Sequence, residues 1–296
     1  MLSLLAPAHE TGFEGYARIL IEIGPLVIYR YAFMILLGIL GALILGLREG
    51  KKLGITTDDI IDGLIIILPI AILGTRVYYV MFDGSWSQFF NIRSGGLAIH
   101  GGFIAAVIAS YFYTKYKKLD IFRVYDLIAP GFLIGQAFGR WGNFFNREAH
   151  GGVVGGMTNG NAVLSHDQQF SFLTDTLKIP EFIANNMFIG GNYVHPTFLY
   201  ESLWNFLGLG VILILRRTKF IRSGDLIAVY LIWYSVARFF IESMRTDALF
   251  IGDTGLRIAQ VISILMVLAG VLILVLNRVV FKRKHYAKIL EENVVQ

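Results

Sequence analysis

The sequence predicts an all-α polytopic membrane protein with seven transmembrane helices and a small extracytoplasmic lobe between the fourth and fifth helices. Of its 296 residues, 55% are hydrophobic and 16% are charged, whereas soluble domains average about 25% charged residues. Seven apolar segments are mostly close to the ~20 residues that a helix needs to cross a bilayer. They lie at 28–47, 60–82, 97–114, 124–143, 197–215, 225–243 and 258–277. We therefore treat residues 1–296 as a single integral-membrane domain.

Basic residues predict the orientation, because cytoplasmic loops carry an excess of lysine and arginine. They cluster after the first, third, fifth and seventh segments and are much rarer on the other side. The clusters are Arg48, Lys51 and Lys52; Lys115, Lys117, Lys118 and Arg123; Arg216, Arg217, Lys219 and Arg222; and Arg278, Lys282, Arg283, Lys284 and Lys288. We expect an extracytoplasmic N-terminus and a cytoplasmic C-terminus in a plasma membrane.

The segments between the spans differ in character. Residues 10–24 mix acidic and apolar side chains, which is typical of an interfacial segment before the first span. The fourth span reads shortest, because Asp126 and Pro130 occupy its first half. Residues 144–196 are too polar to cross a membrane and too long for a turn, so we expect them to form the lobe.

Three glycines of the fourth span, Gly131, Gly135 and Gly139, recur at four-residue spacing. On a helix they share one face, where small residues let a neighbouring backbone approach closely. The spacing predicts tight packing against another span. It would hold the residue that follows, Arg140, in a fixed place.

Polar residues concentrate in the run GRWGNFFNREAHG, residues 139–151. If the helix continues past Gly139, then Arg140, Asn143 and Arg147 share one face at i, i+3 and i+7. Arginine presents a fork of donors that fits phosphate, and Glu148 could orient an arginine. The alternative is that the arginines only anchor the helix end at the interface, which is the favoured interpretation for Arg147.

The sixth span carries a second polar face, with Tyr234, Arg238, Glu242 and Arg245 at i, i+4, i+8 and i+11. Arg238 and Glu242 could form a purely structural ion pair. Two arginines near the outer leaflet, on separate spans, instead favour a phosphate-binding clamp.

His100 lies among glycines in SGGLAIHGGF. Histidine is the usual proton carrier near neutral pH, although a lone histidine is as often a packing residue. Glycines around it allow either a ligand or a close helix approach. Tyr31, Arg76 and Glu201 are weaker candidates, since each could simply brace a neighbour.

Several function classes lack support. The chain has no cysteine, and no HExxH, GxSxG or GxxxxGK motif occurs, so we expect no metal, no cofactor, and no nucleotide or serine-hydrolase chemistry. Nor do we expect a nucleic-acid partner. The residues predict an outward-facing intramembrane site for an anionic lipid head group, with a nucleophile supplied by a second substrate.

GRWGNFFNREAHG resembles in full the signature of bacterial prolipoprotein diacylglyceryl transferases, G-R-x-G-N-F-x-N-x-E-x-x-G. Other segments resemble motifs of the same family, in family order. They are IYRYAF at 28–33, HGGF at 100–103, HPTFLYE at 195–201 and RFFIESMRTD at 238–247. Seven spans is also the family topology. Phe103 stands where the family usually has leucine and Ala32 where it usually has glycine, and residues 151–195 match none of its motifs.

The resemblance implies a reaction. The diacylglyceryl group of phosphatidylglycerol would pass to the lipobox cysteine thiol in the signal peptide of a preprolipoprotein. The products are a thioether and glycerol phosphate, in the first step of bacterial lipoprotein maturation.

The resemblance also implies residue roles. Arg140 would bind the phosphate, Asn143, Glu148 and Gly151 would belong to the same substrate site, and Arg238 would be the second arginine, held by Glu242. His100 would help to activate the thiol, and Tyr234 and Tyr31 would line the cavity. Either His100 or Tyr234 could take the thiol proton.

Two other functions remain as alternatives. Another phosphatidylglycerol-using head-group transferase would share the arginine clamp but would need no thiol acceptor. An anion transporter or channel would use the arginines for selectivity, yet the sequence shows no internal repeat of the kind that many transporters contain.

Overall fold

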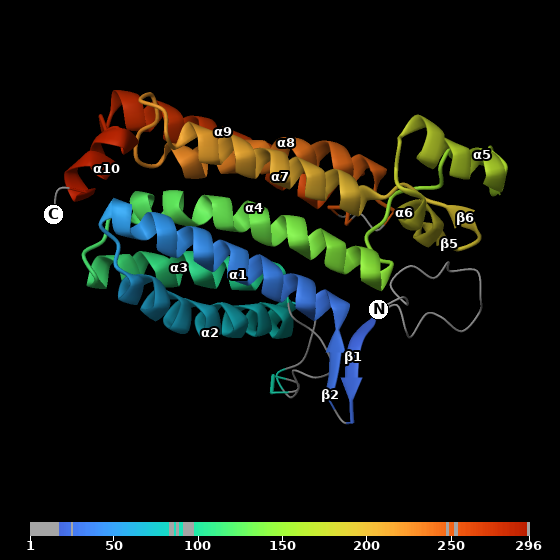
Figure 1. Cartoon of the computed structure of the whole chain (residues 1–296), viewed down its shortest axis with the longest axis horizontal. Coiled ribbons are helices and arrows are strands. Elements are labelled where there is room, and N and C mark those ends of the chain that lie inside the picture. The colour runs from blue at the N-terminus through green and yellow to red at the C-terminus, as the bar shows by residue number, and fades with distance from the viewer. Residues whose placement is uncertain are drawn as a thin grey trace.

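The computed structural model describes residues 18–24, 26–82, 86, 89–90, 98–246, 249–251 and 254–294. Seven long helices within these residues lie side by side and give the molecule an elongated shape (Figure 1). They are α1 (Arg30–Gly50), α2 (Thr57–Phe82), α3 (Ile99–Tyr116), α4 (Ile121–Asn146), α7 (Thr197–Leu215), α8 (Asp225–Met244) and α9 (Ile258–Val279). The structure is therefore predominantly helical, as the composition predicts.

Six of these helices in the described part of the chain are long and apolar enough to cross a membrane. The exception is α3, which has only 18 residues and includes polar residues at both ends, among them His100 and Lys115. The other six predicted spans each coincide with a candidate membrane helix.

Helix α4 occupies the centre of the bundle. It packs against α1, α7 and α8, while α2 pairs with α3 and α9 lies against α8 (Figure 1). The glycine stripe of α4 faces α1. A Cβ added to Gly38 of α1 would lie 3.1 Å from the Cα of Gly135, and one added to Gly131 would lie 3.1 Å from the Cβ of Ala42. The predicted close packing of the stripe is confirmed.

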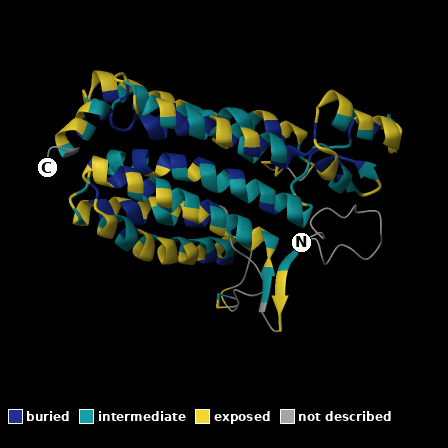
Figure 2. Ribbon diagram, in the orientation of Figure 1, coloured by how far each residue is buried: buried dark blue, intermediate teal, exposed yellow. Residues whose placement is uncertain are grey.

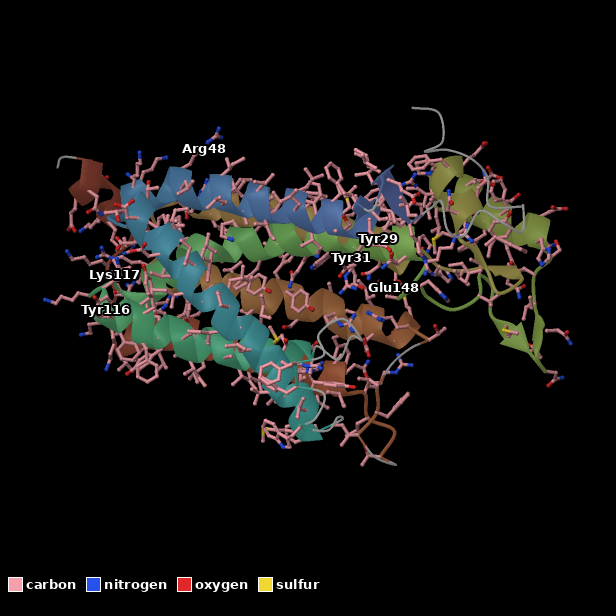
Figure 3. The ribbon with its side chains drawn as sticks, turned by 90° about the horizontal axis from the view of Figure 1, so that it is seen from below. Tyr29, Tyr31, Arg48, Tyr116, Lys117 and Glu148 are labelled. Atoms are coloured by element: carbon pink, nitrogen blue, oxygen red, sulfur yellow. The ribbon has the colours of Figure 1, made fainter. Side chains whose placement is uncertain are left out.

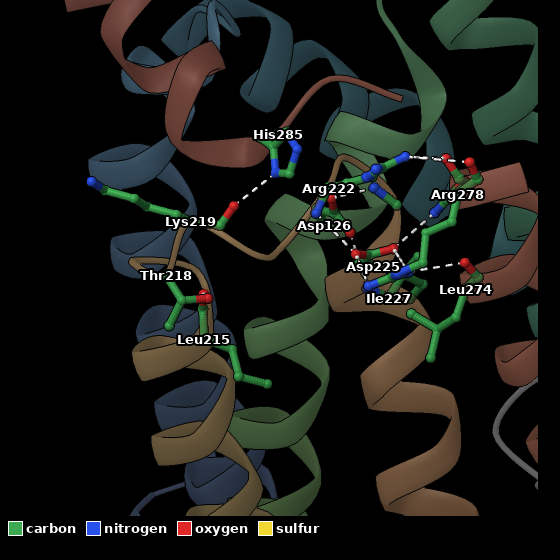
Figure 4. A network of polar contacts seen from close by, with 12 residues as sticks. Asp126, Leu215, Thr218, Lys219, Arg222, Asp225, Ile227, Leu274, Arg278 and His285 are labelled. Carbon is green, nitrogen blue, oxygen red and sulfur yellow. Dashed lines mark hydrogen bonds and ion pairs between the residues drawn. The ribbon is translucent and has the colours of Figure 1, made fainter. Parts of the chain in front are cut away.

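The expectation that the fourth span is shortest is wrong, because α4 runs for 26 residues. Asp126 does not interrupt it. Its buried carboxylate accepts hydrogen bonds from the backbone N–H groups of Gly224 (2.6 Å) and Ile227 (3.0 Å), so it caps the start of α8 (Figure 4). Pro130 is accommodated within the helix, where it is buried, as happens when neighbouring helices compensate for the missing hydrogen bond.

The surface of the bundle is largely apolar. Exposed leucine, isoleucine, valine and phenylalanine side chains cover α2, α3 and α9, while the buried residues lie between the helices (Figure 2). Monomeric soluble proteins rarely expose apolar surface over such an extent. This distribution fits helices that face lipid.

The four basic clusters meet at one end of the bundle. Glu49, near the end of α1, pairs with Arg217 after α7 at 2.7 Å, and Arg283 after α9 pairs with Asp120 before α4 at 2.9 Å. The 3₁₀ turn η2 (Lys51–Leu53) and the short helix α10 (Tyr286–Val294) complete this end. Arg48 and Lys117 lie here, far from Tyr29, Tyr31 and Glu148 at the other end (Figure 3).

The chain between α4 and α7 folds into short elements at the opposite end from α10 (Figure 1). They are β3 (Met157–Thr158), β4 (Asn161–Ala162), α5 (His166–Ser171), the π-helical turn η5 (Phe172–Thr176), α6 (Glu181–Asn186), β5 (Phe188–Ile189) and β6 (Asn192–Tyr193). Buried apolar side chains such as Val154, Leu173 and Ile183 form its own core, distinct from the core between the long helices.

The segment before α1 is a β-hairpin in its described part, where we expected an interfacial segment. Strands β1 (Ile19–Ile23) and β2 (Leu26–Tyr29) pair antiparallel. Residues 10–17 of the expected segment lie outside the described residues.

Candidate active site

Three helices bring their charged residues to one place. Arg140 of α4 and Arg238 of α8 both face Glu201 of α7. The Nη2 of Arg140 lies 2.8 Å from Oε2 of Glu201, and the Nη1 of Arg238 lies 3.7 Å from Oε1. The two arginines that the sequence singled out on separate spans thus share one carboxylate.

Packing between α4 and α7 holds Arg140 and Glu201 next to each other. Trp141 follows Arg140, and its indole N–H donates to the hydroxyl of Ser202, which follows Glu201. The ring of Trp141 also packs on Phe198, with ring centroids 5.3 Å apart. These contacts hold α4 and α7 beside each other at the level of the ion pair.

Glu201 and Glu242 are almost fully buried, with side chains 4% and 3% exposed. An isolated carboxylate in such a place would be very costly, so each needs a cation close by. Glu242 pairs with Arg238 one turn earlier on α8, at 2.6 Å. The carboxylates of Glu201 and Glu242 thus offset the charges of Arg140 and Arg238.

The site nevertheless retains unused hydrogen-bonding capacity. Among the described residues, Nη1 of Arg238 and Oε1 of Glu201 are buried and have no hydrogen-bond partner. The same holds for Oγ of Ser235, one turn before Arg238, and Oδ1 of Asn205, one turn after Glu201. Buried polar atoms are nearly always satisfied in folded proteins, so these four atoms are open to a further polar partner.

The end of α4 adds a chain of side-chain hydrogen bonds that runs through two asparagines. Arg140 donates from Nη1 to Oδ1 of Asn143 at 3.2 Å, and Asn143 donates from Nδ2 to Oε1 of Glu148 at 3.0 Å. Asn146 donates to the same Glu148 oxygen at 3.2 Å. Glu148 is therefore linked to Arg140 through Asn143, which is one way in which it could orient an arginine.

The predicted face containing Arg140, Asn143 and Arg147 is correct only for its first two members. Helix α4 ends at Asn146, and Arg147 adopts a left-handed conformation with φ 53°. Its N–H returns to the carbonyl oxygen of Phe144, which closes the helix end. Arg147 therefore leaves the helical face.

Gly151 lies where three segments converge. Its N–H donates to the carbonyl of His195, and it pairs as a β-bridge with Arg245 after α8. A Cβ at this position would lie 2.8 Å from Cβ of His195 and 3.1 Å from Cγ2 of Thr197. Only glycine fits here, so Gly151 serves close backbone packing beside the site.

Comparison with known proteins decides the family. A profile of prolipoprotein diacylglyceryl transferases matches residues 18–276. The chain belongs to this family. A protein of Bacillus cereus named phosphatidylglycerol–prolipoprotein diacylglyceryl transferase is 47% identical over 266 residues, covering 88% of this chain and 92% of that protein. A protein of Bacillus mycoides with the same name has the same identity and coverage. With the six candidate spans, the family indicates a bacterial membrane protein.

In this member of the prolipoprotein diacylglyceryl transferase family, Tyr31 and Tyr234 lie on two different helices that both pack against α4. Tyr31 of α1 packs over Gly142, where an added Cβ would lie 2.6 Å from its ring. Tyr234 of α8 is one turn from Arg238, and its ring stacks on Tyr230 with a centroid distance of 6.0 Å. Tyr31 thus lies beside the motif helix and Tyr234 beside the second arginine.

His100 is exposed on α3, and its ring lies 6.2 Å from that of Tyr78 on α2. The neighbouring glycines allow α2 and α3 to touch, since a Cβ on Gly101 would lie 2.3 Å from the carbonyl oxygen of Gly74. Of the two uses we gave these glycines, close helix approach is confirmed. No contact among the described residues joins His100 to Arg140 or Arg238.

The residue that the sequence underrated is Glu201. It appeared only as a weak candidate that braces a neighbour, and it proves to bind both arginines. A signal was present, because an acidic residue inside an apolar span is costly and needs a partner. The sequence alone does not show which arginines pair with Glu201.

Beside the site, His195 is half-buried between the lobe and α7. The ring Nδ1 of His195 lies 3.3 Å from the hydroxyl of Tyr200, and its backbone N–H donates to the carbonyl of Gly152. Burial lowers the pKa of His195 below its usual value, because the charged imidazolium loses hydration there. The histidine is therefore neutral in the folded protein at neutral pH.

Proposed function

We propose that the protein transfers the diacylglyceryl group of phosphatidylglycerol to the thiol of a lipobox cysteine in a preprolipoprotein. The observation that carries the site assignment is that Arg140 and Arg238, from helices far apart in the chain, share the buried carboxylate of Glu201. Family membership supports the reaction. No cofactor enters this chemistry.

The proposal includes a membrane topology. We propose seven spans, with α3 crossing beside α2, against which it packs. The end that holds the basic clusters and α10 faces the cytoplasm, as the positive-inside rule requires. The N-terminus and the lobe between α4 and α7 are then extracytoplasmic, and the arginine site opens near the outer leaflet of the plasma membrane.

The arginines would bind the phosphate of phosphatidylglycerol and stabilise it as it leaves. Guanidinium donors match phosphate oxygens in pairs, and donors fixed in a dry site act on the charge that develops in the transition state. The Nη1 of Arg238, which lies 3.7 Å from Glu201 and makes no hydrogen bond, is a donor available to such an oxygen. Glu201, Glu242 and Asn143 keep the two guanidinium groups oriented before the lipid arrives.

The bond changes balance without a further reactant. The thiolate sulfur attacks the glycerol carbon that carries the phosphate, a C–S bond forms, and the C–O bond to phosphate breaks. The electron pair leaves on the phosphate of glycerol phosphate, which becomes a dianion. Thiolate is the stronger nucleophile, so the thiol proton must first pass to a base. Tyr234, one turn from Arg238, and His100 on α3 are the two candidates for this step.

The lobe between α4 and α7 packs on the end of α4, where the rings of Phe144 and Phe198 stack at 4.5 Å. A small hollow at this junction is lined by Asn143, Glu148 and Asn186 among others. We propose that the lipobox segment approaches the site along this side.

The decisive experiment measures lipid transfer to a lipobox peptide in membranes that contain phosphatidylglycerol. Arg140→Ala should abolish transfer. Arg217→Ala, which removes an arginine from the Glu49 ion pair at the other end, should retain it. Full activity of Arg140→Ala would refute the assigned site.

Replacing the acceptor cysteine of the peptide by serine tests the reaction itself. The proposed chemistry requires sulfur, so the serine peptide should receive no lipid. Transfer to serine would instead favour a different phosphatidylglycerol-using head-group transferase.

A further inference from the structure

A second charged site lies at the opposite end of the bundle, between the loop after α7, the end of α9 and helix α10. There the surface forms a hollow of about 550 Å³. Six of its eight lining residues are lysine or arginine, and one, Glu292, is acidic. The proposed transferase chemistry uses none of these residues.

Part of this positive charge is already neutralised. Arg278 binds both carboxylate oxygens of Asp225, at 3.1 and 3.0 Å (Figure 4). Arg283 binds Asp120 and Lys284 binds Glu292 in the same two-oxygen manner. Three lining residues are thus already paired with carboxylates.

The other three cations have no acidic partner among the described residues. Lys282 and Lys288 are exposed. The guanidinium of Arg222 donates to the carbonyl oxygens of Asn277 and Arg278, and only its backbone N–H reaches a carboxylate, that of Asp225. Three uncompensated positive charges therefore face one hollow. Their mutual repulsion favours an anion that several of them can bind at once.

The hollow is built on fixed backbone. The N–H of Ser223 donates to the carbonyl of Lys284, and the N–H of Tyr286 donates to that of Ile221 at 2.7 Å. Tyr286, the first residue of α10, is fully buried. The ring Nδ1 of His285 lies 2.7 Å from the carbonyl oxygen of Lys219 (Figure 4). The cations are therefore carried by a segment that is held in place on both sides.

Exposed apolar side chains lie next to the lining residues along the chain. Val279 ends α9, Val280 and Phe281 follow it, and Phe220 lies two residues before Arg222; all four are exposed. The guanidinium of Arg283, a lining residue, lies 5.9 Å from the ring centroid of Phe281. Phe220 is 82% exposed. Apolar residues next to a group of cations suit a ligand that has both a charged and an apolar part. A soluble anion would give these side chains nothing to contact.

We propose that this hollow binds the phosphate head group of an anionic phospholipid in the leaflet at the α10 end of the bundle. Lys282, Lys288 and Arg222 contact the phosphate, and the apolar rim lies along the acyl chains. Basic pockets beside membrane helices are the usual means of recognising such head groups. Residues after 276, which include both lysines and α10, lie outside the part of the chain that the family profile matches.

The test uses the full chain, purified in mild detergent and titrated with phosphatidylserine, an anionic lipid that lacks the glycerol head group. Bound lipid is counted by native mass spectrometry. The double variant Lys282→Gln/Lys288→Gln should bind about 25-fold more weakly at low salt, about fivefold for each lysine.

The matched control removes the same charge at the same end. Lys51 and Lys118 are exposed and lie outside the hollow, and Lys118 shares the left-handed conformation of Lys282, with φ 55° against 44°. Lys51→Gln/Lys118→Gln should bind the lipid as the unmodified protein does. Equal binding by all three proteins, or equal weakening in both variants, would overturn the proposal.

A last arm separates a lipid from a free anion. Inorganic phosphate is added in competition, and neutral phosphatidylcholine replaces phosphatidylserine. The lipid should resist millimolar phosphate, and phosphatidylcholine should not bind the hollow. Displacement by phosphate, or binding of phosphatidylcholine that is insensitive to the lysine variant, would contradict a head-group site. Lipid transfer is not part of the readout, so the result does not depend on the proposed enzymatic activity.

Discussion

Replacing Glu201 with glutamine is the sharpest perturbation of the candidate site. Glutamine keeps the size of the side chain and can still accept one hydrogen bond, but it removes the charge that Arg140 and Arg238 share. The two guanidinium groups would then repel each other across a buried space. We expect them to separate and to lose the arrangement that the phosphate needs.

The magnitude follows from the geometry. At 2.8 Å the attraction between Arg140 and Glu201 amounts to about 6 kcal/mol with an effective dielectric constant of ~20. Breaking a buried pair by removing one partner costs about 3–5 kcal/mol after solvation is included. The Arg140 side chain is 20% exposed, so we take the lower value. About 3 kcal/mol corresponds to a fall in kcat/KM of roughly 150-fold.

The assay is transfer of labelled lipid to a lipobox peptide, with the melting temperature measured on the same preparations. Glu49→Gln is the matched control. Glu49 is equally buried and also faces two arginines, Arg217 at 2.7 Å and Arg216 at 3.9 Å, but at the other end of the bundle. It should lower stability and leave kcat/KM of the folded protein unchanged.

A Glu201→Gln protein that is folded and within threefold of full activity would refute the reasoning. The test uses the single variant, because Arg140→Ala is itself expected to abolish transfer and Glu201 also contacts Arg238.

Three further predictions concern the residues around the site. Arg147→Gly should keep its activity and melt slightly higher, because glycine relieves a left-handed conformation that costs an arginine about 1 kcal/mol; loss of transfer would show that the side chain contacts substrate. Gly151→Ala should reduce both activity and stability, since its Cβ would lie 2.8 Å from that of His195; unchanged kinetics would contradict this. The pKa of His195 is lowered in the folded protein, so the unfolded chain takes up a proton at this residue first as the pH falls. The free energy of unfolding should therefore be highest above pH 6.5 and decline below it. Melting temperatures from pH 7.5 to pH 5 measure this decline, which should shrink in His195→Gln.

The helices could be predicted from the sequence because length and apolarity suffice to define them. The first span was expected at 28–47, and α1 is Arg30–Gly50. The fourth was misjudged because Asp126 and Pro130 usually interrupt a helix. Only the tertiary structure shows that Asp126 is satisfied by the backbone of α8. The residues next to Asp126 in the sequence do not reveal which distant groups its carboxylate binds.

The site was predictable as a set of residues but not as a set of contacts. Helical spacing placed Arg238 beside Glu242, and the pair is present at 2.6 Å. Spacing also placed Arg147 on the face of Arg140, which failed because the helix ends one residue earlier. Contacts within one helix follow from its period. Contacts between helices, such as those of Glu201, depend on how the spans pack.

The two buried glutamates show what separates a structural ion pair from a binding site. Both oxygens of Glu49 accept hydrogen bonds, from Arg217 and from the hydroxyl of Tyr286, although Nε of Arg216 beside it has no partner. Glu201 also faces two arginines, yet its Oε1 and the Nη1 of Arg238 remain without hydrogen-bond partners among the described residues. A carboxylate whose two oxygens are both bonded by its own protein holds helices together, whereas one with an open oxygen beside an open donor leaves room for a ligand. We therefore propose that the arginines at Glu201, rather than those at Glu49, exchange part of their internal contacts for a phosphate.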